Sequence, residues 1–99
     1  MSTIKVTLQN NLFCYEGVLT FDTTLKALTE TLKNFPKEGV VELDLKNVSK
    51  SDSSGLALLT NLLSKAKEKN LHLRIKNTPK KMRDLARVSG LDELLPFSN

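Results

Sequence analysis

Three segments of the chain alternate hydrophobic and polar residues with the period of two that is typical of half-buried strands. In the first, residues 4–8, Ile, Val and Leu alternate with Lys and Thr. Asn10 and Asn11 follow, and because Asn tolerates the positive φ of a tight turn, residues 12–19 can fold back as the second arm of a hairpin. Gly17 within that arm indicates a bulge.

The other two alternating segments, residues 41–45 and 71–75, predict the third and fourth strands. Their hydrophobic and charged positions fall on opposite faces, so we expect one face of the sheet to contact solvent. The single histidine, His72, falls on the polar side of the fourth strand and is expected to be a surface residue rather than a catalyst.

Between these strands the hydrophobic spacing changes to three and four residues, which predicts helices. The first helix is expected to begin at Asp22, Thr23 or Thr24, any of which could cap it, and to end before Pro36. The hydrophobic residues of its expected stripe are Leu25, Leu28, Leu32 and Phe35.

A second helix is predicted after Ser53 and a third after Thr78-Pro79, with Asn70 closing the second and Gly90 the third. The second should be the central buried helix, and its stripe consists of Leu56, Leu59, Leu63 and Ala66, widened by Leu58 and Leu62. The buried side of the third consists of Met82, Leu85 and Ala86, and a short turn, Asp92 to Leu95, precedes Pro96. This order of elements predicts an α/β fold, a mixed four- to five-stranded sheet backed by helices.

The length of 99 residues predicts a single domain, residues 1–99, because a second core would have too little sequence to bury its surface. No apolar stretch approaches the roughly 20 residues that span a bilayer, and no secretory signal is recognisable, so a cytoplasmic location is expected. Cys14 has no partner for an internal disulfide, its role is left open, and with one histidine no metal site is expected.

The formal net charge of +4 is concentrated in the last third of the chain. The cations there are Arg74, Lys76, Lys80, Lys81, Arg83 and Arg87, and Asp84 is the acidic residue among them. Such a stretch can attract an acidic partner or nucleic acid. Because no aromatic residues interleave these charges to stack on bases, we expect a solvated helix face and no nucleic-acid binding.

The sharpest local feature is the quartet Asp52, Ser53, Ser54 and Gly55, where a strand leads into the central helix. Asp52 or Ser53 can accept hydrogen bonds from the first turn of that helix, and Gly55 lets another backbone or a partner approach closely. These residue types are usual at a helix start. An exposed hydroxyl there can also be phosphorylated, which makes Ser53 or Ser54 a candidate switch.

Residue patterns of the common catalytic sites are missing from the chain. A nucleophilic Ser53 would need a base, and His72 stands in a strand whose spacing gives no reason for proximity. Neither a G-x-S-x-G elbow nor a G-x-x-x-x-G-K-[ST] loop occurs, and the glycines are scattered singly. We therefore expect no enzymatic activity and no cofactor.

Nearly the whole chain resembles a STAS domain, the family named for sulfate transporters and anti-sigma factor antagonists. The resemblance is carried by the hairpin opening, by Val40–Leu59 and by Pro79–Phe97. Within the family, Gly55–Glu68 and Ala86–Phe97 are most similar to the MlaB-like STAS subunits of phospholipid-transport ABC complexes in Gram-negative bacteria.

This resemblance implies a non-catalytic cytoplasmic subunit, peripheral to the inner membrane, that binds an MlaF-like ATPase and supports assembly or activity of the transporter. Such a transporter maintains outer-membrane lipid asymmetry, and this subunit would not touch lipid. The implied contact and regulatory residues are Asp52, Ser53, Ser54 and Gly55. The same quartet is typical of anti-sigma factor antagonists, in which the hydroxyl after the Asp, here Ser53, is phosphorylated by an anti-sigma factor kinase.

Overall fold

The computed structural model describes residues 3–98, which form one four-stranded sheet in the order β1-β2-β3-β4. Strands β1 and β2 are antiparallel, whereas β2, β3 and β4 run parallel to one another. The strands are β1 (Ile4–Gln9), β2 (Leu12–Leu19), β3 (Val40–Ser51) and β4 (His72–Lys76). The α/β fold with a mixed sheet is therefore confirmed, with four strands.

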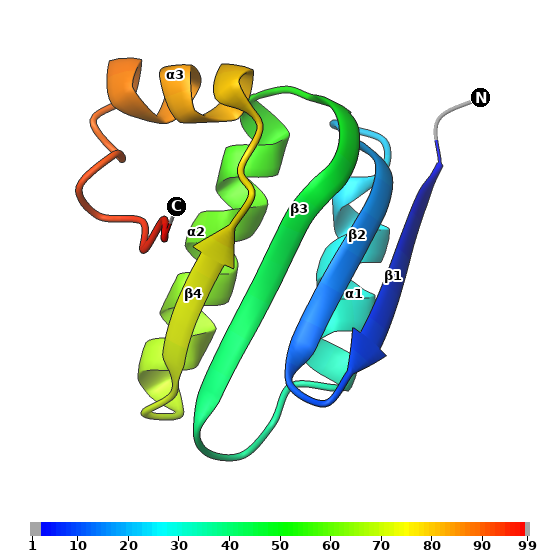
Figure 1. The fold of residues 1–99 in the computed structure, drawn as a ribbon, viewed down its shortest axis with the longest axis vertical. Coiled ribbons are helices and arrows are strands. Elements are labelled where there is room, and N and C mark those ends of the chain that lie inside the picture. Colours follow the sequence, from blue (N-terminus) through cyan, green and yellow to red (C-terminus); the bar gives the residue numbers. More distant parts are fainter. Residues whose placement is uncertain (1–2, 99) are drawn as a thin grey trace.

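Three helices accompany the sheet: α1 (Thr24–Lys33), α2 (Ser53–Glu68) and α3 (Lys80–Val88). Figure 1 shows α1 and α2 side by side behind one face of the sheet, while α3 lies crosswise beyond the end at which β3 finishes. The helix α2 contacts both other helices. The same end of the molecule therefore contains the end of β3 and the first turns of α2 and α3.

The predicted hairpin and bulge are present in β1 and β2. Asn10 adopts a φ of 58° in the turn between the strands. Gly17 adopts a φ of 120°, and a Cβ there would collide with the carbonyl oxygen of Thr3. The pairing of β2 with β3 shifts register at Gly17/Val18 and also near Cys14. These shifts break the period-two pattern along β3, so the alternation indicated only residues 41–45 although the strand extends to Ser51.

The core lies between the sheet and helices α1 and α2. Its fully buried side chains include Phe13, Leu43, Leu45, Leu59 and Leu62. In α2 the predicted stripe is correct at Leu56, Leu59 and Ala66, but Leu62 is buried completely whereas Leu63 is only half-buried.

In α1 the predicted stripe is wrong at Leu25, which is 74% exposed. The residues buried against the sheet are Ala27 and Thr31, and the Thr31 hydroxyl is 2.6 Å from the Tyr15 hydroxyl. At 3.6 residues per turn, Leu25 points about 160° away from Ala27. A small residue and a threonine bound to a buried phenol bring α1 close to β2, and the pattern of large hydrophobic residues does not reveal that face.

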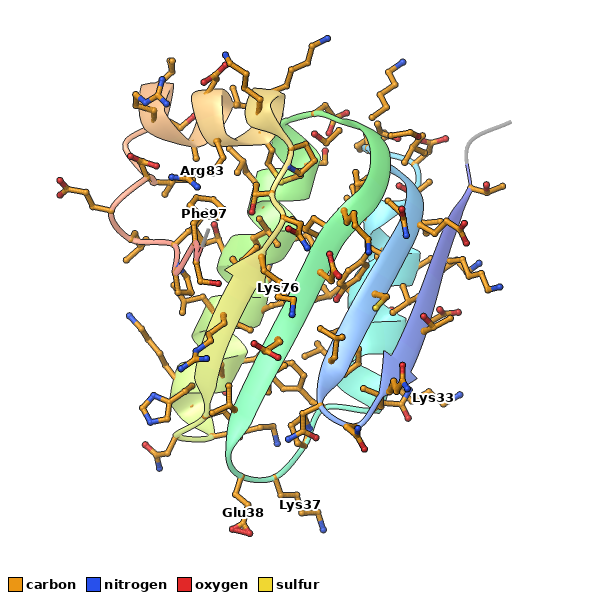
Figure 2. The ribbon with its side chains drawn as sticks, in the orientation of Figure 1. Lys33, Lys37, Glu38, Lys76, Arg83 and Phe97 are labelled. Atoms are coloured by element: carbon orange, nitrogen blue, oxygen red, sulfur yellow. The ribbon has the colours of Figure 1, made fainter. Side chains whose placement is uncertain are left out.

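The face of the sheet opposite the helices contacts solvent, as expected, and pairs charges across β3 and β4. Glu42 and Arg74 are neighbours in register, as are Asp44 and Lys76. Figure 2 labels Lys76 on this face. Burial alone would raise the pKa of Asp44. Hydrogen bonds from the Lys46 amide (2.9 Å) and the Asn77 side chain (3.1 Å), with the charges of both lysines, hold that pKa below its usual value instead.

The C-terminal segment returns along β4. The Ser98 amide donates a hydrogen bond of 2.8 Å to the Ile75 carbonyl, and the Ile75 amide donates one of 3.0 Å to the Pro96 carbonyl. Between them the Phe97 ring lies under the Arg83 guanidinium, whose carbon is 4.6 Å from the ring centre (Figure 2). This contact fixes α3 relative to the edge of the sheet.

Candidate partner-binding surface

Asp52 fixes the start of α2. Its carboxylate accepts a hydrogen bond of 2.8 Å from the Ser54 amide, so Asp52 rather than Ser53 is the N-cap residue. Its second oxygen accepts a bond of 3.2 Å from the Phe21 amide in the connection between β2 and α1. One carboxylate therefore holds the beginnings of two helices beside each other.

Because Asp52 caps the helix, the Ser53 hydroxyl is not needed for that role. Ser53 is the first residue of α2, it is exposed, and its side chain makes no hydrogen bond within residues 3–98. Ser54 is half-buried and faces α1. Of the two candidate serines, Ser53 is thus the one whose hydroxyl is presented to solvent.

Gly55 is buried and has an internal role. A Cβ at this position would lie 3.1 Å from the terminal methyl of Met82 and 3.2 Å from the carbonyl oxygen of Leu19. The absence of a side chain therefore lets the first turn of α2 pack closely against the end of β2 and against α3. The close approach predicted for Gly55 is made by this chain's own backbone.

Large apolar side chains lie exposed near the start of α2, since the Phe21 amide binds Asp52 and Leu25 shares a groove with Ser54. Phe21 is 84% exposed and Leu25 is 74% exposed. Leu25 borders a groove of about 240 Å³ between the first turns of α1 and α2. The groove is lined by Thr24, Leu25, Leu28, Ser54, Ala57, Leu58 and Asn61. We call Phe21, Leu25, Ser53, Ala57 and Asn61, together with this groove, the α1–α2 surface.

The apolar part of this surface was not predicted from the sequence. Leu25 matched the spacing of a buried stripe, and Phe21 falls in a connection to which no role was assigned. The available signal was a phenylalanine standing among Thr20, Asp22 and Thr23, where a turn needs only polar residues. A large hydrophobic residue in such a place is informative because turns are exposed.

Comparison with known families decides the membership of the chain. The family model described as "Mlab, STAS domain" matches residues 16–96. The chain belongs to this STAS family. A search of curated proteins found no matching relative. The matched range contains the quartet from Asp52 to Gly55 and Ser53 in particular, and it excludes β1.

STAS domains are generally non-catalytic, and the geometry of this one offers no support for a catalytic serine. His72 opens β4 and lies beside Val40 at the start of β3, whereas Ser53 follows the other end of β3. The two side chains are therefore at opposite ends of the sheet. Within residues 3–98, no group of three or more metal-ligand residues gathers, and no helix is long and apolar enough to cross a membrane.

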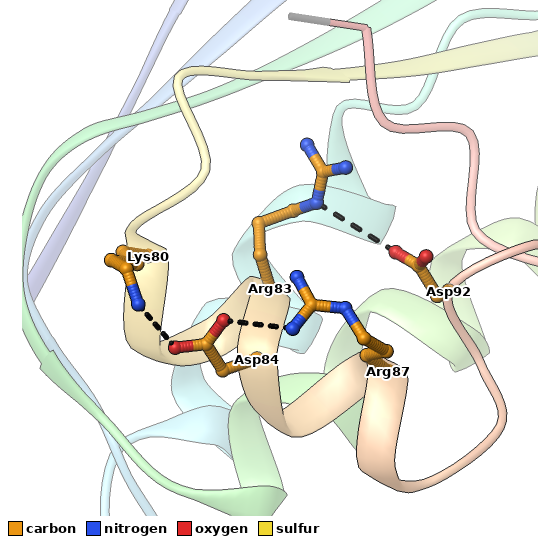
Figure 3. Close-up of polar contacts among 5 residues, drawn as sticks. All are labelled: Lys80, Arg83, Asp84, Arg87 and Asp92. Carbon is orange, nitrogen blue, oxygen red and sulfur yellow. Dashed lines mark hydrogen bonds and ion pairs between the residues drawn. The ribbon is translucent and has the colours of Figure 1, made fainter.

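The basic helix α3 of the STAS domain borders a second hollow, of about 300 Å³, at the end of β3. Its lining residues are Val48, Ser49, Lys50, Ser51, Pro79, Lys80 and Lys81. Figure 3 shows how the helix balances part of its charge: Asp84 lies 2.8 Å from the Lys80 ammonium and 3.3 Å from the Arg87 guanidinium. The hydrogen bond from Lys80, with the charges of Lys80 and Arg87, lowers the pKa of Asp84.

Proposed function

We propose that this STAS domain is a non-catalytic subunit that binds the ATPase of a phospholipid-transport ABC complex and supports its assembly or activity. On this proposal it works at the cytoplasmic side of the inner membrane, attached only through the complex, and the transporter maintains outer-membrane lipid asymmetry. The observation that carries the proposal is the exposure of Phe21 and Leu25 beside the free hydroxyl of Ser53.

The α1–α2 surface has the composition of a protein interface. Binding energy at interfaces concentrates in a few aromatic and aliphatic side chains that become fully buried, surrounded by polar residues that exclude water. Phe21 and Leu25 supply the apolar centre, and Ser53 and Asn61 are exposed polar residues beside it. The groove between α1 and α2 accepts a projecting side chain of the partner.

The MlaB-type family description favours a transporter ATPase as the partner. A second candidate function is that of an anti-sigma factor antagonist controlled by phosphorylation, and the exposed hydroxyl of Ser53 is the observation that favours it. Phosphate on Ser53 would add about two negative charges next to the Asp52 carboxylate and beside Phe21. Both functions use the same surface, so they differ in the partner rather than in the site.

Purification of the tagged chain from its own cells in mild detergent, followed by mass spectrometry, distinguishes the two functions. The proposal expects an ABC ATPase together with a membrane permease. Recovery of a soluble serine kinase instead, with phosphate on Ser53, would replace the transporter function by the regulatory one. A tagged Phe21→Ala/Leu25→Ala variant serves as the matched control, because it should recover neither partner.

A further inference from the structure

The hollow between the end of β3 and the start of α3 carries an uneven charge. Three lysines line it, Lys50, Lys80 and Lys81, and no acidic side chain does. Lys80 is paired with Asp84, but neither Lys50 nor Lys81 forms an ion pair within the described part of the chain. Counting Asp84 against the three ammonium groups leaves two positive charges without a counter-ion.

Other features of the hollow add to this positive potential. The first turn of α3 contains no acidic residue, and no side chain caps its amides. Its positive dipole end therefore adds to the potential of the lysines. Val48 and Pro79 provide apolar wall, and the Ser51 hydroxyl makes no hydrogen bond within residues 3–98. A carboxylate on a short aliphatic stem matches this combination of ammonium groups, hydroxyl and apolar wall.

We propose that this hollow binds an acidic segment, rich in Asp or Glu, of the same protein that docks on the α1–α2 surface. The inference rests on the proposed function, since it assumes a protein partner at Ser53. Ser51 lines the hollow and Ser54 lines the α1–α2 groove, so the two sites are separated by only Asp52 and Ser53. An ordinary interface covers about 800 Å² on each partner, which is enough to extend from one site to the other.

The acidic segment steers the partner toward this end of the molecule. Charges lining a concave site focus the electric field, and complementary charges raise association rates more than they raise affinity. The concave shape of the hollow favours a projecting carboxylate over the flat layer of headgroups that a membrane presents. A partner that carries acidic side chains beside an apolar patch is thus the chemistry that fits both sites.

The hollow can be tested without the partner, by titrating the isotopically labelled chain with a blocked oligoglutamate peptide and following its amide resonances. We expect shifts confined to the amides of residues 48–51, Lys80 and Lys81, and weaker binding at higher salt. The variant Lys50→Gln/Lys81→Gln should bind about fivefold more weakly, as expected for the loss of two exposed charge pairs. The control Lys67→Gln/Lys69→Gln, with the same change in net charge at the other end of α2, should bind like the parent chain.

Equal loss of binding in both variants, or shifts spread over all lysines, would overturn the proposal. So would two further results. Inorganic phosphate binding there as tightly as the peptide would make the hollow a small-anion site, and vesicles containing phosphatidylglycerol shifting the same amides in place of the peptide would make it a membrane contact.

This titration is independent of the proposed function. If the peptide binds at the hollow but no ABC ATPase is recovered from cells, only the transporter function fails. If the ATPase is recovered equally well by the parent chain and by Lys50→Glu/Lys81→Glu, only the acidic-segment proposal fails. The variant Phe21→Ala/Leu25→Ala should leave peptide binding unchanged, because neither residue lines the hollow.

Discussion

Truncation of Phe21 and Leu25 should remove partner binding while leaving the fold intact. In the free chain these side chains are 84% and 74% exposed, so Phe21→Ala/Leu25→Ala removes little buried area. The hydrogen bond from Phe21 to the Asp52 carboxylate uses the backbone amide of Phe21, not its ring, and is retained. We expect the free energy of unfolding to change by less than about 1 kcal/mol, which is within a few degrees in Tm.

The effect on binding is much larger, because burying such a side chain contributes about 1.5 to 3 kcal/mol. Scaled by the exposed fractions, the pair contributes about 2.4 to 4.7 kcal/mol, a loss of roughly sixty- to three-thousandfold in affinity. The assay is quantitative mass spectrometry of proteins captured by the tagged chain, with circular dichroism for stability. Val88→Ala is the matched control, since Val88 is also 84% exposed but lies on α3. Unchanged capture by the double variant, or an equal loss in the control, would show that the partner does not bind through these two side chains.

Three further predictions concern the core, the serine and pH. Leu59→Ala should lower the free energy of unfolding by about 2 to 5 kcal/mol in denaturant titrations, because Leu59 is completely buried. An unchanged free energy of unfolding would show that this face of α2 does not pack in the core. Ser53→Glu should weaken capture of the partner yet shift Tm by no more than a few degrees, since Asp52 is the cap; unfolding would contradict this. Burial raises the pKa of Asp44, but hydrogen bonds and nearby lysines outweigh it and hold that pKa below 3.8. The ionised carboxylate therefore stabilises the fold above pH 3.8, and this stabilisation is lost as the pH falls through the folded-state pKa. The free energy of unfolding should therefore fall less steeply with decreasing pH in Asp44→Asn than in the parent chain. Identical pH profiles would show that the Asp44 carboxylate does not stabilise the fold.

The fold could be predicted because its strands and helices leave regular patterns in the chain. Alternation in residues 4–8, 41–45 and 71–75 indicates strands with one solvent-exposed face. Asn70 adopts the left-handed conformation expected at the end of α2, with a φ of 59°. The alternating pattern did not reveal the part of β3 in which the strand pairing is irregular. Two register shifts hide the second half of β3, which reaches Ser51.

The candidate site was only partly predictable, for physical reasons. Local chemistry was enough to place Asp52 and Ser53 at the start of α2, because capping depends on residues next to each other. Local chemistry could not choose between them, and the second bond of Asp52, to Phe21, joins residues 31 positions apart. Leu25 was misplaced because hydrophobicity measures preference for burial, whereas its exposure depends on how α1 is rotated about Thr31.

The position of the partner on the α1–α2 surface is tested most directly by site-specific photo-crosslinking in cells. A photoreactive amino acid replaces Ala57, which is exposed on α2 next to the groove, and in a second strain replaces Lys67, exposed near the other end of the same helix. We expect position 57 to crosslink to an ABC ATPase and position 67 not to do so. A crosslink from position 57 to a soluble kinase, or an ATPase crosslink from position 67 alone, would contradict this expectation.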